Sequence, residues 1–150
     1  MSAIEQDLMK LYSERILALA AGISHLGRLD DAHGSATRRS PLCGSTVTID
    51  VRMDGGRIAD LAQDVKACAL GQASASVMAA DAVGRTRDEI ARGREALTAL
   101  IKQDGPIPGA PFEDLENLRP ARDYKNRHAS ILLAWDAALA AIDAADSGAG

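Results

Sequence analysis

Two cysteines are the residues of this chain whose type and spacing best suit chemistry. Cys43 lies in the segment Pro41-Leu-Cys-Gly44, and Cys68 opens the run Cys68-Ala-Leu-Gly-Gln-Ala-Ser-Ala-Ser-Val-Met78. The thiolate is the form of cysteine that binds metal or attacks a persulfide sulfur, and two convergent thiolates suit iron, zinc or a cluster. In an arbitrary protein each cysteine would more often be a small buried hydrophobe. The sequence around the pair therefore has to decide between these readings.

The elements between the two cysteines are predicted to bring them together. Residues 47–53 alternate between apolar and polar types, and a second β-branched run, 58–65, follows the turn signal at 54–56. This pattern predicts an antiparallel hairpin. Small residues over 68–83 predict a helix that packs closely on a sheet. A thiol at a loop edge and another at a helix N-terminus, where dipole and unpaired amides favour thiolate, can converge at one end of that sheet.

The remaining chain is predicted to be mainly helical. Apolar spacing indicates a first helix over 4–21 and a last helix over 121–145. Between them, after the helix over 68–83, the capping box Thr86-Arg-Asp-Glu89 predicts the start of another helix. The segment 22–40 has no periodicity and is predicted to be a long loop, either mobile or functional. Gly- and Pro-rich residues across 104–120 leave room for at most a short amphipathic turn.

This order of elements indicates an α+β domain. We expect a small antiparallel sheet of about three strands, covered on one face by helices. A chain of 150 residues fits one domain, taken as 1–150 with a disordered tail from about 143 to 150.

Composition excludes some partners. Only 3% of residues are aromatic and the formal net charge is −4, which argues against a nucleic-acid partner. Small basic clusters at Arg38-Arg39 and at Lys125 to Arg127 are expected to be solvated charges, although they could dock an acidic patch on a partner. The N-terminus has no basic region leading into an apolar stretch, and no ~20-residue apolar span is apparent, so no membrane partner and a cytoplasmic location are expected.

The two cysteine segments resemble the iron–sulfur cluster assembly scaffolds of the IscU, SufU and NifU-N-terminal family. In that family a Cys-Gly pair enters the sheet, and a second Cys precedes an Ala-Ser-x-Ser-x-Met-like run. Leu133-Ala-Trp135 also resembles the family's last helix. The resemblance implies a SufE/NifU-like fold and a scaffold that is not an enzyme. Such a scaffold would bind iron or a nascent cluster through Cys43 and Cys68. Its partners would be a cysteine desulfurase and iron–sulfur acceptor proteins.

Two positions depart from the family's pattern. Ser45 aligns with the Asp that the family carries two residues after its first Cys, and Ser130 aligns with its third Cys. A neutral hydroxyl binds soft or borderline metals weakly compared with thiolate or imidazole, so metal affinity should fall. His128 is a candidate substitute ligand, but it is as well explained as a buried, hydrogen-bonded core histidine. Loop-borne His25 and His33 are weaker candidates.

The departures leave three functions open. The first is a cluster scaffold. Because the chain lacks the Leu-Pro-Pro-Val-Lys segment of some family members, it is closer to SufU than to the scaffolds served by a chaperone. The second is a zinc-binding sulfur acceptor for a cysteine desulfurase, and the third is a metal-free interaction module. No Ser-His-Asp order, phosphate loop or nucleotide fingerprint is visible, so self-contained catalysis is not expected.

Overall fold

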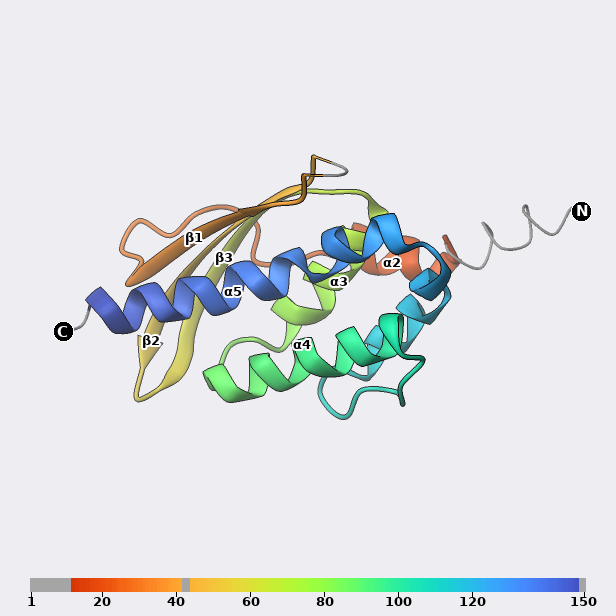
Figure 1. Ribbon diagram of the computed structural model, residues 1–150. Coiled ribbons are helices and arrows are strands. Elements are labelled where there is room, and N and C mark those ends of the chain that lie inside the picture. The colour runs from red at the N-terminus through yellow and green to blue at the C-terminus, as the bar shows by residue number, and fades with distance from the viewer. Residues whose placement is uncertain (1–11, 42–43, 149–150) are drawn as a thin grey trace, which may run out of the picture.

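The computed structural model describes residues 12–41 and 44–148 and has the predicted α+β architecture (Figure 1). The three strands form one antiparallel sheet in the order β1-β2-β3. Its elements in chain order are α2 (Glu14–Ala21), β1 (Gly34–Arg39), β2 (Thr46–Asp54), β3 (Arg57–Lys66), α3 (Ala69–Ala80), α4 (Arg87–Lys102), the 3₁₀ helices η1 (Glu113–Asp123) and η2 (Lys125–Arg127), and α5 (His128–Gly148).

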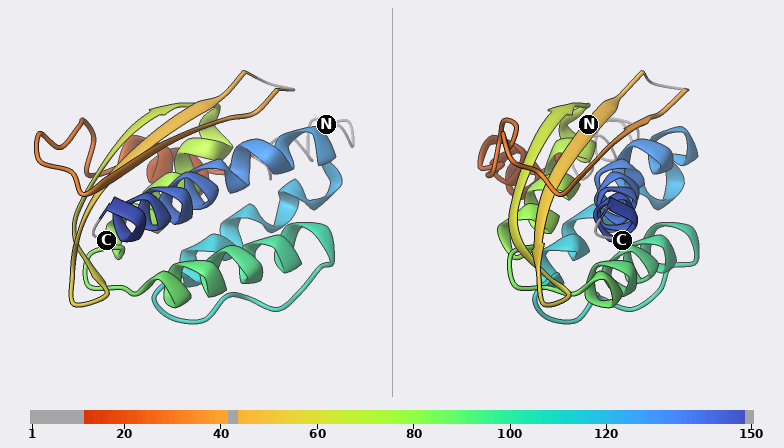
Figure 2. Two further views of the ribbon diagram at one scale, coloured as in Figure 1. Left: turned by 60° about the vertical axis from the view of Figure 1, so that its left-hand side comes forward. Right: turned by 90° about the vertical axis from the view of Figure 1, so that its left-hand side faces the viewer.

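The core lies between one face of the sheet and the helices. Val47, Ile49 and Val51 alternate along β2 and are at most 1% exposed, as the period of a strand with one covered face requires. Helix α5 packs on β1 and β2, α3 packs on α5, and α4 packs on α5 and η1 rather than on the sheet (Figure 2). Leu, Ile, Val and Ala build this core around a single tryptophan, Trp135, which is fully buried.

The last helix begins later and ends later than the sequence predicts. Residues 113–123 form η1, residues 125–127 form η2, and α5 starts at His128. Pro120 lies inside η1 and cannot donate the amide hydrogen bond of a continuing α-helix. At its other end α5 runs to Gly148, which is beyond the point, about residue 143, where the sequence predicts a disordered tail to begin; residues 149–150 of that tail lie outside the described residues. Arg87 Nε donates to Asp143 at 2.7 Å, and Ala145 is buried, so packing holds this end in the helix.

Helix α5 is also more apolar than the sequence analysis predicts. The helical stretch 125–146 is long and apolar enough to cross a membrane by length and composition, although no such segment was expected. However, 67% of that window is buried inside the protein, and its apolar side packs on β1, β2, α3 and α4. These properties are those of the central helix of a folded core.

The segment 22–40 is not the continuous loop that its composition predicts. Its last part is β1, which pairs with β2 from Gly34 opposite Val51 to Arg39 opposite Thr46. Earlier in the segment, the Gln63 amide donates to the His25 carbonyl and the Gly27 amide donates to the Gln63 carbonyl, which adds a short bridge at the free edge of β3. Pairing partners outside the segment thus override its lack of β-patterning.

A buried carboxylate holds the rest of this segment on the sheet. Asp50 of β2 accepts hydrogen bonds from the Arg28 side chain, the Ser35 hydroxyl and the Leu29 amide. Burial raises the pKa of Asp50, but these hydrogen bonds outweigh it and lower the pKa to about 2. Because Asp50 alternates with the core residues Ile49 and Val51, the segment covers the face of the sheet opposite the helices.

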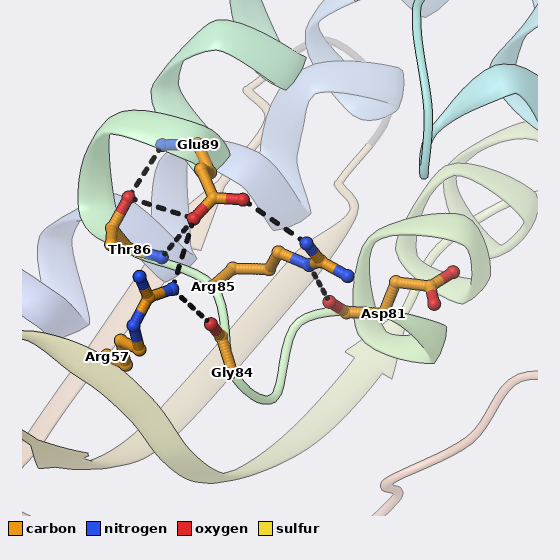
Figure 3. A network of polar contacts seen from close by, with 6 residues as sticks. All are labelled: Arg57, Asp81, Gly84, Arg85, Thr86 and Glu89. Atoms are coloured by element: carbon orange, nitrogen blue, oxygen red, sulfur yellow. Dashed lines mark hydrogen bonds and ion pairs between the residues drawn. The ribbon is translucent and has the colours of Figure 1, made fainter.

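The predicted capping box at Thr86 is present and belongs to a wider network (Figure 3). Thr86 Oγ accepts from the Glu89 amide, and Glu89 accepts in return from the Thr86 amide. Arg57 donates to the Gly84 carbonyl at 2.9 Å and approaches Glu89 at 3.5 Å, while Arg85 reaches the other Glu89 oxygen at 3.3 Å. These contacts lower the pKa of Glu89, led by the backbone hydrogen bond from Thr86. The network fixes α4 against the turn end of the hairpin.

Candidate functional site

The register of the β2–β3 hairpin brings the two motif segments together. Thr46, the first residue of β2, pairs with Lys66, the last residue of β3. Ser45 precedes Thr46 and Cys68 follows Lys66 by two positions, so both residues lie at the same end of the sheet. Cys68 is the N-cap residue of α3, has an extended backbone, and makes no side-chain capping hydrogen bond. The Cys68 thiol therefore does not cap the N-terminus of α3.

The side chains of Ser45, Cys68 and Ser130 meet at this end of the sheet, and we call them the Ser45–Cys68–Ser130 cluster. Ser130 Oγ lies 3.0 Å from Ser45 Oγ and 3.7 Å from Cys68 Sγ. Ser45 is 4% exposed and Ser130 is 1% exposed, whereas Cys68 is half-buried. A thiol with access to solvent thus lies over two buried hydroxyl groups, contributed by three separate segments of the chain.

A glycine allows Ser130 to approach Cys68 this closely. Gly71 lies in the first turn of α3, and a Cβ atom there would lie 2.8 Å from Ser130 Oγ, 3.2 Å from the Ser130 carbonyl oxygen and 2.9 Å from Ala67 Cβ. Such distances are too short for carbon, so any larger residue would push α3 away from α5. Gly71 therefore sets the separation between the two helices at the cluster.

Ser74 joins the same two helices one turn further along. Its hydroxyl donates to the Ile131 carbonyl at 2.6 Å and accepts from the Trp135 indole Nε1 at 2.9 Å. All these groups are buried, so the hydrogen bonds also satisfy polar atoms that would otherwise cost stability. Sequence reasoning missed the positioning roles of Gly71 and Ser74. The run of small residues after Cys68 was the available signal, since small residues mark close helix packing.

Cys43, the other predicted ligand, lies outside the described residues. The described residues on either side of it are held in place: the Gly44 amide donates to the Ser40 carbonyl at 2.9 Å, and the Ser40 amide donates to the Ser45 carbonyl at 2.8 Å. Gly44 has φ +70°, a backbone conformation that favours glycine. These contacts close the β1–β2 connection at its base, next to the cluster.

His128 does not join the cluster. Its Nε2–H donates to the Ala121 carbonyl at 2.8 Å, and the residue is 6% exposed. Positions two apart on a helix differ by about 200° around its axis, so His128 and Ser130 point to different sides of α5. The geometry fits the core-histidine reading and not the substitute-ligand reading. His33 is also engaged elsewhere, because its Nδ1 accepts from the Met53 amide.

The cluster alone is not a complete metal site. Within residues 12–41 and 44–148, no group of three or more His, Cys, Asp or Glu side chains is placed to hold a metal ion. The positions where the family resemblance implies Asp and Cys hold neutral hydroxyls, which are weak ligands for iron or zinc. What the cluster offers is one accessible thiol, two adjacent oxygen atoms and a connection that carries a second cysteine.

This combination, a three-stranded antiparallel sheet covered by helices with a cysteine at the sheet end of α3, defines the chain as a small α+β domain of the scaffold class. Residues 11–146 match the NifU-like N-terminal domain family. That match covers most of the chain, which therefore belongs to this family.

Individual relatives agree with the assignment. The chain is 43% identical to a NifU-like protein from Brucella abortus, with a TM-score of 0.90 over 94% of this chain and 98% of that one. It is 28% identical to the iron–sulfur cluster assembly scaffold protein IscU of Thermotoga maritima over 83% of this chain and 87% of that protein. FiSufU from Fervidobacterium islandicum, at 24% identity and a TM-score of 0.80 over 89% and 98% of the two chains, shares the fold.

Proposed function

We propose that this chain is an iron–sulfur cluster assembly scaffold whose cargo is iron or a nascent cluster. The observation that carries the proposal is the meeting of Ser45, Cys68 and Ser130 at the end of the sheet. These are three of the positions at which the family resemblance implies cluster ligands. The names of the relatives from Thermotoga maritima and Archaeoglobus fulgidus, which are iron–sulfur cluster assembly scaffold proteins, support the same role.

The spacing of the cluster suits ligands of a single metal centre. For a tetrahedral ion with a metal–sulfur distance of about 2.3 Å and a metal–oxygen distance of about 2.0 Å, the two donor atoms lie about 3.5 Å apart. Cys68 Sγ and Ser130 Oγ are 3.7 Å apart, and the two hydroxyl oxygens are 3.0 Å apart. Little rearrangement is therefore needed to place a metal against Cys68.

Cys43 completes the proposed donor set. It precedes Ser45 by two residues, and a two-residue stretch spans at most about 7 Å between Cα atoms. The assignment of Cys43 as a ligand rests on the family resemblance of the Pro41-Leu-Cys-Gly44 segment. We assign the two thiolates to the cargo, with Ser130 and Ser45 as weak oxygen contacts that shape the site.

The serines predict a weakly held cargo. A hydroxyl must lose its proton to donate as an anion, whereas the Asp and Cys that the resemblance implies are readily available as carboxylate and thiolate. Release to an acceptor protein should accordingly be fast. By analogy with the family, the proposed partners are a cysteine desulfurase that supplies sulfur and an acceptor that receives the cluster. We also propose that the chain is not an enzyme and that it is cytoplasmic.

Anaerobic reconstitution tests the proposal. Purified protein incubated with ferrous iron and sulfide should develop the visible absorption bands of an iron–sulfur cluster, and both Cys68→Ala and Cys43→Ala should abolish them. Stoichiometric zinc in place of a cluster would favour a zinc-binding sulfur acceptor. If neither forms, a metal-free interaction module remains and the scaffold proposal fails.

Two further variants separate the candidates for a third contact. Ser130→Ala should reduce the amount of cluster retained, because it removes the oxygen next to Cys68 Sγ. His128→Ala should leave cluster content unchanged and lower the melting temperature, because it removes the buried hydrogen bond to the Ala121 carbonyl. A loss of cluster in the His128 variant alone would show that His128 is a ligand and that the assignment of Ser130 is wrong.

A further inference from the structure

A second site lies on a different side of α5 from the cluster. A cavity of about 350 Å³ is lined by Ile101 and Lys102 at the end of α4, Arg122 of η1, Lys125 of η2 and His128 of α5. Figure 1 shows these elements meeting where the chain passes from the 3₁₀ helices into α5. The cavity is lined by residues of four elements, which are close only because the chain folds.

The charges around this cavity are not balanced. Three cationic side chains, those of Lys102, Arg122 and Lys125, line it in a chain whose formal net charge is −4. Asp104 takes up part of the charge, since it pairs with Arg122 at 2.7 Å, and Asp123 lies 4.0 Å from Arg122. Lys102 and Lys125 have no ion pair among residues 12–41 and 44–148. Two cations thus face one cavity without a carboxylate partner.

Two largely buried side chains, Ile101 and His128, form the inner wall of the cavity. Ile101 is 1% exposed and His128 is 6% exposed. The hydrogen bond from His128 Nε2–H to the Ala121 carbonyl fixes the imidazole ring. The other ring nitrogen, Nδ1, has no hydrogen-bond partner in the described part of the chain. Exposed cations thus surround a wall of buried side chains, which distinguishes this cavity from scattered surface lysines.

We propose that this cavity binds a small multivalent oxyanion, such as phosphate or a tricarboxylate. Lysine and arginine are the side chains that recognise phosphate and carboxylate oxygens. Lys102 and Lys125 supply the two unpaired cations, and Arg122 adds positive charge that Asp104 offsets in part. The volume is at the lower end of the range for small-ligand pockets. A five-residue lining suits a compact ligand and not an extended acidic peptide, which would need a longer groove.

Binding should connect the four elements that line the cavity. One anion that contacts Lys102, Arg122 and Lys125 would hold α4, η1 and η2 against the start of α5. Because a ligand that binds only the folded state stabilises it by mass action, the melting temperature should rise with anion concentration. This inference does not depend on the cluster, which Ser130 presents on a different side of the helix.

Titration with inorganic phosphate and with propane-1,2,3-tricarboxylate, at constant ionic strength, tests the site. Either anion should shift the amide resonances of residues 101–104 and 121–128 with a saturable 1:1 profile and raise the melting temperature. A double variant, Lys102→Gln with Lys125→Gln, should weaken binding at least tenfold. Both side chains are exposed, so this variant should fold normally.

The control is Arg92→Gln combined with Arg39→Gln. It removes the same number of charges from exposed positions outside the cavity and should leave the affinity unchanged. Equal weakening in both double variants would show that the response is general charge screening and would overturn the proposal. Absence of saturation with both anions, or saturation only by a poly-glutamate peptide, would also overturn it.

Discussion

Replacing Ser130 by cysteine should turn the cluster into a stronger metal site. Two thiolate sulfurs bound to one tetrahedral zinc, each about 2.3 Å from the metal, lie about 3.8 Å apart. The atom that Ser130 now places beside Cys68 lies 3.7 Å from its sulfur, so a sulfur at this position needs only a small adjustment. Gly71 has no side chain facing Ser130, so no Cβ atom there would clash with the larger sulfur.

The expected gain follows from the strength of zinc–ligand bonds. Structural zinc sites with four ligands bind with roughly 10–16 kcal/mol at neutral pH, or about 3 kcal/mol for each ligand. Exchange of a weak hydroxyl contact for a thiolate should therefore lower the dissociation constant roughly 100-fold. Loss of the hydrogen bond to Ser45 should cost the metal-free variant about 1 kcal/mol. Its melting temperature should fall without zinc and rise above that of the parent with zinc.

Competition with a chromophoric chelator measures the zinc affinity directly. Ala129→Cys is the matched control, because residue 129 is exposed and is displaced by about 100° around the helix from Ser130. It adds the same thiol one residue away from the cluster and should leave the affinity near that of the parent protein. If Ser130→Cys and Ala129→Cys bind zinc equally, the cluster does not face a metal position and the proposed site is wrong.

Three other predictions concern the residues that position the cluster or hold the sheet. Ser74→Ala should lower the free energy of unfolding by about 1–3 kcal/mol, because it leaves the buried indole N–H of Trp135 without an acceptor; urea unfolding measures this. Gly71→Ala should lower the free energy of unfolding by a similar amount, about 1–3 kcal/mol, and should reduce the amount of cluster retained, because α3 moves away from Ser130. Unchanged retention would contradict the role given to Gly71. Because the pKa of Asp50 is lowered from 3.8 to about 2, its contribution of about 2 kcal/mol is present above pH 4 and lost between pH 4 and 2. Asp50→Asn should therefore be less stable than the parent at pH 7, and the difference should vanish near pH 2.

The sequence predicts well the parts of the fold that local patterns determine. The alternation along β2, the Asp54-Gly55-Gly56 turn and the capping box at Thr86 each fix their structure within a few residues of the chain. The hairpin then determines most of the site, because its pairing alone places Ser45 beside Cys68. Ser130, by contrast, could be placed at the cluster only through the resemblance to the family, because it comes from a helix far along the chain.

Contacts between distant segments account for what the sequence did not show. The strand β1 has no alternating pattern of its own and exists because β2 offers it a partner, while the preceding segment depends on Asp50 in the middle of β2. The side of α5 occupied by His128 could not be assigned while the start of the helix was uncertain by several residues, since each residue turns the helix by about 100°. In the part of the chain that the structure describes, His128 donates to the Ala121 carbonyl and contacts no member of the Ser45–Cys68–Ser130 cluster by a hydrogen bond.

The pairing of Ser45 with Ser130 explains how the family's fold tolerates the exchange of its expected ligands. An unpaired hydroxyl buried at either position would cost about 1–3 kcal/mol, and a lone buried carboxylate would cost more. Two hydroxyls 3.0 Å apart satisfy one another, so the metal-free site is stable as it stands. Displacing the hydrogen bond between the two hydroxyls should cost about 1 kcal/mol, which is small beside about 3 kcal/mol for a thiolate ligand. The proposed site is therefore weak because it lacks strong donor atoms. Placing a single sulfur at position 130 should for this reason be enough to strengthen metal binding.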